Sequence, residues 1–172
     1  LQFADVKGKN PFKDVRVRQA LYHAINIEAI QKAVMRGSSD PTGAIIQRAV
    51  NGWTPEAHQR LPYDQTKARE LLAAAGYPNG FSFTLDCPNN RYINDEKICI
   101  AVAGMLAKIG IAVKVNAMPR SQYFQKTQKL DTSFYMLGWG GATTDAMFTL
   151  QPVLHSRNDK GDGDYNWGNV RD

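Results

Sequence analysis

Apolar residues along the chain recur with helical spacing in some segments and with strand spacing in others. After Asp14, Asp64 and Asn94 they follow one another three and four positions apart, which is the spacing of one helix face. The segments 81–85 and 111–115 instead alternate apolar and polar residues, as half-buried strands do. The expected buried helix positions are Val17, Ala20, Leu21, Ala24, Ile25, Ala68, Leu71, Leu72, Ala75, Ile98, Ala101, Val102, Met105, Leu106 and Ile109.

Polar residues and glycines mark the expected ends of these helices. A side-chain oxygen at the N-cap accepts a hydrogen bond from the first turn, and glycine ends a helix because it adopts the left-handed conformation without strain. The expected N-caps are Asp14, Asn26, Asp64 and Asn94 or Asp95, and the expected terminators are Gly37, Gly76 and Gly110. Between Asn26 and Gly37 the apolar positions are Ile27, Ile30 and Val34.

Two segments show neither spacing. Residues 38–62 carry several prolines and glycines, and a loop of this length is uncommon unless it packs on a neighbour. We expect it to cross the surface of the domain with Trp53 as its anchor. Residues 165–172 have the composition of a loop, without a helix or strand.

The later part of the chain predicts three short elements. A short helix is expected after Pro119, with Tyr123 and Phe124 facing inward. Residues 133–137 indicate a fully buried strand that leads into Gly138-Trp139-Gly140-Gly141, and a further helix is expected at Ala146–Leu150.

The order of strand, helix and strand between Phe81 and Val115 indicates a crossover unit, which makes at least part of the sheet parallel. The chain has 172 residues, 43% of them hydrophobic, which suits one packed domain. The sequence therefore predicts an α/β fold with a mixed sheet flanked by helices. No apolar run approaches the roughly 18–20 residues that a membrane span needs.

The net charge of +5 raises the question of nucleic-acid binding. However, the 21 lysines and arginines are scattered among 16 acids and form no basic run. A recognition helix or an aromatic-basic stripe would concentrate them. We therefore expect no nucleic-acid partner.

Two cysteines, Cys87 and Cys99, stand between a predicted strand and the next helix. The histidines His23, His58 and His155 are dispersed, so the cysteines do not belong to a zinc-site pattern. The remaining alternatives are a disulfide, which an exported protein permits, and two buried thiols. A disulfide would tie the end of the strand to the start of the helix.

The motifs of common enzymes and cofactor sites are absent from the sequence. There is no GxSxG, HExxH or P-loop lysine motif, and the glycines at 138–141 lack dinucleotide-binding spacing. Asp159, Asp162 and Asp164 suggest a calcium loop, but the glutamate that an EF-hand loop needs is replaced by Val170. We expect no catalytic residues, no cofactor and no metal.

Two loops carry side chains suited to ligand binding. Asn89, Asn90, Arg91 and Tyr92 follow one predicted strand, and Trp139 with Gly140 and Gly141 follows another. Ligands of open α/β sheets bind at the carboxyl ends of the strands. Arginine supplies a bidentate donor for a carboxylate, and tyrosine an amphipathic ring. A surface arginine beside a packing tyrosine is the alternative explanation.

Four segments together resemble a family of transport receptors. Residues 11–20 with 24–30 resemble the PFxDxRVRQAxxxAIDxxxI signature of the family 5, or peptide- and nickel-type, solute-binding proteins of ABC importers. Residues 63–81 are similar to the family's YDPxKAxxLLxEAGYxxGF segment. Residues 105–113 resemble its LxxIGIxV stretch, and 138–139 its GW strand end.

The resemblance implies a two-lobed receptor that closes on its ligand and delivers it to the transmembrane subunits of an ABC permease. Residues 1–172 would form a single truncated C-terminal ligand-binding lobe, without the first lobe and the C-terminal return through the hinge. We expect any signal peptide to lie outside the chain, which starts at Leu1. The full-length protein would be a periplasmic or otherwise extracytoplasmic monomer, reaching the membrane only indirectly or through an absent lipid anchor. The alternative is the ligand-sensing module of a transcriptional regulator built on the same lobes.

The resemblance also implies roles for individual residues. Arg91 matches the arginine that pairs with the ligand carboxylate in dipeptide-binding members, and Tyr92 and Trp139 match residues that line the cleft. Peptide binders place an aspartate for the ligand ammonium three residues after that tryptophan, where this chain has Ala142. Asp145 either substitutes for it or, as we favour, caps the following helix. A peptide with a blocked amine, or a ligand with no amine, then becomes more plausible than a free peptide.

Overall fold

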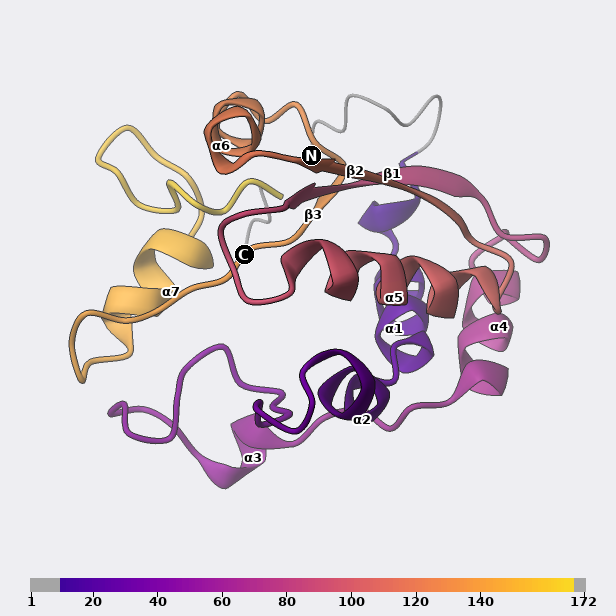
Figure 1. The fold of residues 1–172 in the computed structure, drawn as a ribbon, viewed down its shortest axis with the longest axis horizontal. Coiled ribbons are helices and arrows are strands. Elements are labelled where there is room, and N and C mark those ends of the chain that lie inside the picture. The colour runs from indigo at the N-terminus through magenta and orange to yellow at the C-terminus, as the bar shows by residue number, and fades with distance from the viewer. Residues whose placement is uncertain (1–9, 169–172) are drawn as a thin grey trace.

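A parallel sheet of three strands lies between helices in the computed structural model, which describes residues 10–168 (Figure 1). The strands β1 (Ser82–Pro88), β2 (Ala112–Met118) and β3 (Phe134–Tyr135) are arranged in the order β2-β1-β3. The chain returns through a helix between successive strands, so each strand runs in the same direction. The predicted α/β class is confirmed. Within residues 10–168 every ladder is parallel, so the antiparallel part of the expected mixed sheet is not found there.

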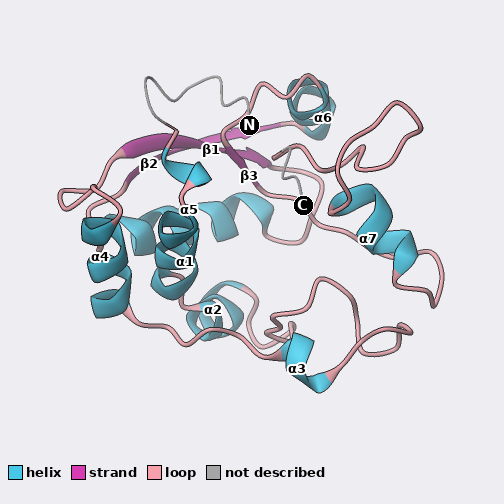
Figure 2. Cartoon of the chain, turned by 180° about the vertical axis from the view of Figure 1, so that it is seen from behind, coloured by secondary structure: helices cyan, strands magenta, loops and turns pink. Residues whose placement is uncertain are grey.

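Side chains of β1 point alternately to two helical layers. Cys87 faces α5 (Asp95–Ala107), and Asp86 faces α6 (Arg120–Gln128). Figure 2 shows α1, α4 and α5 on one side of the sheet and α6 on the other. The central strand is therefore covered on both faces, and Leu85 is 2% exposed.

The main core lies between the sheet and two packed helices, α1 (Val15–Ala24) and α4 (Gln65–Ala74). The rings of Phe83 and Phe134 lie 5.0 and 5.8 Å from that of Phe12, which belongs to a 3-10 turn at Pro11–Lys13. Burial of each large apolar side chain contributes about 1.5–3 kcal/mol. The fully buried residues of this core include the predicted positions Val17, Ala20, Leu21, Ala24, Ala68, Leu72, Leu106 and Ile109.

The predicted helix ends are confirmed at three N-cap residues and at three terminating glycines. The N-cap oxygens accept hydrogen bonds of 2.8–2.9 Å from first-turn amides in three helices, those capped by Asp14, Asn26 and Asp64. Positive φ angles of 80, 91 and 86° are found at the terminators Gly37, Gly76 and Gly110. The helix after Asn26 begins as α2 (Ile27–Ala29) and continues as a π-helical turn at Ile30–Val34.

The irregular segment 38–62 includes one short helix, α3 (Pro55–His58). The half-buried Trp53 has the Arg48 guanidinium 5.5 Å from its ring centroid. Residue Asn51 bonds through its backbone to Thr144 and Ala146, so the segment packs against the chain after β3.

Two expectations about the C-terminal half need correction. The fully buried strand expected at 133–137 is the two-residue β3, and both residues are only half-buried because β3 lies at the edge of the described sheet. The helix expected at Ala146–Leu150 is α7 (Met147–Val153). The described residues 165–168 form a loop without helix or strand, as expected, and within this loop Trp167 is 2% exposed because it packs in an aromatic cluster. Residues 169–172 lie outside the described part of the chain.

Within residues 10–168, helices that combine the length and the apolar character of a membrane span are not found.

Candidate functional site

The carboxyl ends of the three parallel strands meet at one edge of the sheet, which we call the ligand edge. It is formed by the loop 89–94 after β1, the connection at Pro119 after β2 and the loop 136–146 after β3. Both loops that the sequence nominated for binding therefore lie at the same edge. In open α/β sheets this is the edge at which ligands collect.

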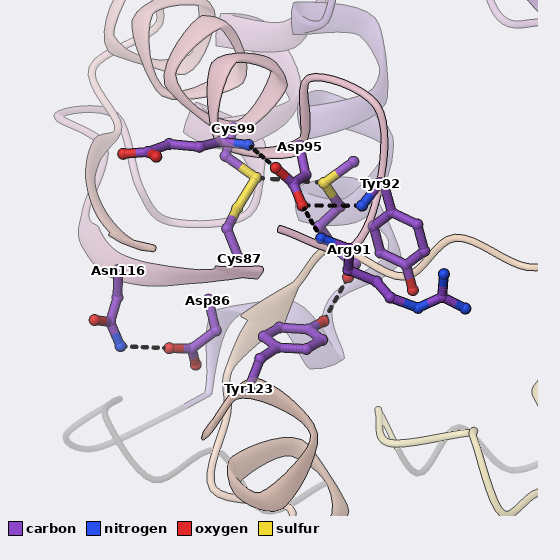
Figure 3. Close-up of a disulfide and its surroundings, with 10 residues drawn as sticks. Asp86, Cys87, Arg91, Tyr92, Asp95, Cys99, Asn116 and Tyr123 are labelled. Carbon is purple, nitrogen blue, oxygen red and sulfur yellow. Dashed lines mark hydrogen bonds between the residues drawn. A yellow bond between two sulfur atoms is a disulfide. The ribbon is translucent and has the colours of Figure 1, made fainter. Parts of the chain in front are cut away.

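Asp95 holds the loop after β1 in shape. One carboxylate oxygen accepts hydrogen bonds from the backbone N–H groups of Arg91 and Tyr92, at 2.9 and 3.0 Å, and the other accepts one of 2.9 Å from Glu96 (Figure 3). Burial alone would raise the pKa of Asp95, but these backbone donors outweigh it and hold the pKa below its usual value. The carboxylate therefore stays charged at neutral pH and fastens the loop to the start of α5.

A disulfide joins the two elements that flank the same loop, β1 and α5. In the structure Cys87 at the end of β1 is bonded to Cys99 in α5, with the two Cα atoms 6.7 Å apart. Both cysteines are buried, at 0 and 2% exposed. The bond removes conformational freedom from the unfolded chain. It also links the strand to the helix on either side of Arg91.

The Arg91 side chain extends away from the disulfide beside the Tyr92 ring (Figure 3). Its guanidinium carbon lies 5.1 Å from the centroid of that ring, within the range of a cation–π contact. The residue is exposed, and the ion pairs found within residues 10–168 do not include it. A guanidinium held in this way can accept an external carboxylate as a bidentate partner.

Tyr92 connects this loop to the one after β3. Its hydroxyl donates a 3.2 Å hydrogen bond to the carbonyl of Gly138. A Cβ atom at Gly138 would lie 2.7 Å from Cε1 of Tyr92, so the ring reaches this position only because residue 138 has no side chain. The neighbouring Trp139 is half-buried, with its ring 4.8 Å from that of Tyr165. Gly140 and Gly141 are exposed in the same loop.

Asp145 directly precedes the N-cap residue of α7, Ala146. Its Oδ1 accepts a 2.8 Å hydrogen bond from the backbone N–H of Met147. This is the contact that the capping alternative predicts. Ala142 is exposed three residues after Trp139.

A buried polar network beneath the ligand edge was not found by sequence reasoning. Asp86 is 1% exposed and accepts 2.7 Å hydrogen bonds from Asn116 and Thr132, with Lys126 Nζ at 3.2 Å. The only sequence signal is that Asp86 and Asn116 occupy matching positions of two predicted strands. The network ties β1, β2 and α6 together, so it supports the position of the edge.

Tyr123 of α6 fixes the start of the loop after β3. Its hydroxyl donates a hydrogen bond to the carbonyl of Met136. Burial raises the pKa of Tyr123, so the hydroxyl keeps the proton that it donates.

Other residues that the sequence analysis considered have local partners. His23 Nδ1 lies 2.7 Å from the carbonyl of Pro62. Asp162 accepts hydrogen bonds from Gln151 and Asn158, which lower its pKa. A group of acids, histidines or cysteines able to hold a metal ion is not found within residues 10–168.

The sequence matches the family described as bacterial extracellular solute-binding proteins, family 5 Middle, over residues 2–161. The chain belongs to this family. Its fold agrees with that of a solved periplasmic binding protein. The resemblance inferred from the motifs is therefore confirmed.

Curated relatives and solved structures of this family 5 protein include binders of several small molecules. It is 32% identical over 155 residues to the glutathione-binding protein GsiB of Shigella flexneri, covering 87% of this chain and 30% of the relative. The periplasmic binding protein DppA of Helicobacter pylori, solved with the peptide STSA, is 27% identical with a TM-score of 0.85, over 95% of this chain and 31% of that one. AgaA of A. tumefaciens R10, solved with agropinic acid, is 32% identical with a TM-score of 0.77, over 87% and 30%. The family 5 chain thus spans about a third of the length of these relatives.

Proposed function

We propose that the chain is a ligand-binding lobe of the substrate-binding component of an ABC importer, which captures a peptide-like acid outside the cytoplasmic membrane. The full-length protein would bind its ligand between this lobe and a second one, and deliver it to a membrane permease. The observation that carries the proposal is Arg91, an exposed guanidinium at the ligand edge that the ion pairs within residues 10–168 do not include.

The rigid attachment of Arg91 supports a binding role. Asp95 and the Cys87–Cys99 disulfide fix its backbone, so little freedom remains to be lost when a ligand binds. A disulfide between β1 and α5 also favours an exported protein over a cytosolic regulator, because cytosolic thiols are kept reduced.

The proposed ligand class follows from two features of this edge: it offers a cation for a carboxylate, and it offers no free carboxylate at position 142 for an ammonium group. The ligands named for these relatives, glutathione, a peptide and agropinic acid, are all carboxylic acids, which suits Arg91. Ala142 offers no charge to an ammonium group, and Asp145 is engaged with the start of α7. An ammonium left without a carboxylate in a closed cleft would be costly. The protein therefore binds a peptide-like acid whose amine is blocked or absent.

The proposed mechanism is binding without bond chemistry. Arg91 anchors the carboxylate, Tyr92 and Trp139 form the wall beside it, and closure of the second lobe removes the ligand from water. A charge-assisted hydrogen bond to a carboxylate contributes about 1.5–3 kcal/mol, more when the pair is withdrawn from solvent.

Calorimetry on the full-length protein tests the role of Arg91. Arg91→Gln should weaken binding of an N-acetylated peptide at least about tenfold, since the pair is worth about 1.5–3 kcal/mol. Lys108→Gln removes the same charge from the far end of α5 and should leave the affinity unchanged. The C-terminal amide of the peptide should bind wild type as weakly as the acid binds the variant. Equal affinity of wild type and Arg91→Gln would refute the assignment.

A further inference from the structure

Arg120, at the first position of α6, is a second exposed cation at the ligand edge. We propose that Arg120 binds a second carboxylate of the ligand, so that the protein prefers peptide-like acids with an acidic residue at the C-terminus. This inference rests on the proposed function, because it takes Arg91 as the anchor of the first carboxylate.

Two hydrogen bonds place Arg120 beside the Arg91 loop. The β1–β2 ladder ends at the pair Pro88↔Met118, and the Asn89 N–H donates to the carbonyl of Met118 at 3.0 Å. One residue further, the side-chain oxygen of Asn90 accepts a 2.8 Å hydrogen bond from the backbone N–H of Arg120. Neighbouring strands lie about 4.8 Å apart. Arg91 and Arg120 therefore leave the same edge from adjacent, mutually bonded loops.

The two buried acids nearest these loops, Asp95 and Asp86, are engaged elsewhere. The ion pairs of residues 10–168 do not include Arg120. Asp95 is 4% exposed and accepts three backbone hydrogen bonds, and Asp86 is 1% exposed beside Lys126. Two exposed arginines thus stand in the adjacent loops after β1 and β2, and an external anion is the partner that their guanidinium groups fit.

The stability of α6 does not explain an arginine at this position. The N-terminal end of a helix carries the positive end of its dipole, where a cation is unfavourable and an anion favourable. The first turn of α6 contains no acid that would offset the charge of Arg120. A bound carboxylate would relieve this repulsion and be attracted by the arginine and the helix end together.

The edge consequently has two chemically different halves. Arg91 and Arg120, in the adjacent loops after β1 and β2, form the cationic half. Tyr92 lies beside the Arg91 guanidinium and donates to the carbonyl of Gly138, so it begins the aromatic half on the side of β3. A ligand whose acidic end occupies the first half would place its remaining part against the aromatic half. A C-terminal glutamate brings two carboxylates to the cationic half, and a C-terminal glutamine of the same shape brings one.

A pair of peptides tests this preference in the full-length protein. N-acetyl-Ala-Ala-Glu should bind wild type about tenfold more tightly than N-acetyl-Ala-Ala-Gln. The reason is the one additional charge-assisted hydrogen bond between the glutamate side chain and Arg120. Arg120→Gln should bring the two affinities together by weakening only the Glu peptide. Arg91→Gln should weaken both peptides, and Lys108→Gln should change neither. Thermal unfolding should show Arg120→Gln to be at least as stable as wild type, since it removes an unfavourable charge from the helix end.

The outcomes separate the two hypotheses. If wild type does not distinguish the peptides, or if the preference persists in Arg120→Gln, the second carboxylate site is disproved while the Arg91 effect still supports the proposed function. If Arg91→Gln changes neither affinity, the proposed function itself fails.

Discussion

At the scale of single residues, the absence of a side chain at Gly138 positions the wall of the ligand edge. The Tyr92 ring occupies the space where a Cβ would stand, and its hydroxyl donates to the Gly138 carbonyl. Because the Arg91 guanidinium lies over the same ring, a displaced ring would also change the surroundings of Arg91. If the ligand binds as proposed, Gly138 would act on it through Tyr92.

Gly138→Ala should weaken ligand binding with little effect on stability. The ring can rotate away from the new methyl group, but the cation–π contact with Arg91 would be lost, which costs about 1 kcal/mol or about fivefold in affinity. Calorimetry and thermal unfolding of the full-length protein measure the two effects separately.

Gly104→Ala is the matched control, since its Cβ would meet nothing within 4 Å on the exposed side of α5. It should leave the affinity unchanged and stabilise the helix by about 0.5–1 kcal/mol. An unaltered affinity in Gly138→Ala would show that Tyr92 does not contribute to binding.

Residue-scale features were predictable from the sequence where they depend on neighbours along the chain. Asp14, Asn26 and Asp64 cap the helices that they precede, because capping needs only a local side chain. The hydrogen bond between Asp86 and Asn116 was not predictable, because it depends on the register of two strands 30 residues apart.

At the scale of elements, the first turn of α5 and the preceding loop form one unit. Asn94 has a left-handed backbone with φ of 56°, which turns the chain so that Asp95 can reach back to the amides of Arg91 and Tyr92. From the sequence, Asn94 or Asp95 is expected only to begin the helix. The backward contact was missed because it depends on this backbone turn.

Asp95→Asn should loosen the loop and weaken binding. In asparagine an NH₂ group replaces one of two oxygens that face backbone donors, and an unsatisfied buried group costs about 1–3 kcal/mol. The free energy of unfolding and the ligand affinity should both fall. Glu96→Gln removes the same charge one residue later, at an exposed position, and should cost only a few tenths of a kcal/mol. Equal effects of the two variants would contradict the role of Asp95.

The same contact predicts a pH dependence. The pKa of Asp95 is lowered in the folded protein from its ordinary value of 3.8, so its contribution to stability is fully present above that value. It is lost as the pH falls through the lowered pKa of the folded state. Asp95→Asn should therefore differ from wild type in stability at neutral pH and approach it in strong acid, as denaturation curves at several pH values would measure.

The positions of helices and strands were predictable where the spacing of their own apolar residues determines them. The apolar faces of α1, α4 and α5 repeat with helical spacing and were placed by it. β3 was expected to be longer and fully buried, but its length and burial depend on its place at the edge of the described sheet. Trp167 lies in a segment without periodicity, so its burial against Tyr123 and Tyr135 left no sequence signal.

At the scale of the whole molecule, the parallel sheet gathers the binding residues at one edge. The candidate residues come from loops nearly fifty positions apart, Arg91 and Trp139, and only the common direction of the strands brings them together. The crossover from β1 through α5 to β2 was predictable from the sequence, and so was the choice of these two loops as candidate binding loops. The second guanidinium at Arg120 was not, because its nearness depends on the Asn90 hydrogen bond.

The central claim is that the full-length protein holds a peptide-like acid through Arg91. Native mass spectrometry of wild type and Arg91→Gln, purified side by side without denaturation, tests it most directly. Wild type should carry about one small acidic molecule per protein, as an affinity in the micromolar range or tighter allows, and Arg91→Gln should carry much less. A bound molecule without an acidic group, or the same occupancy in both proteins, would contradict the claim.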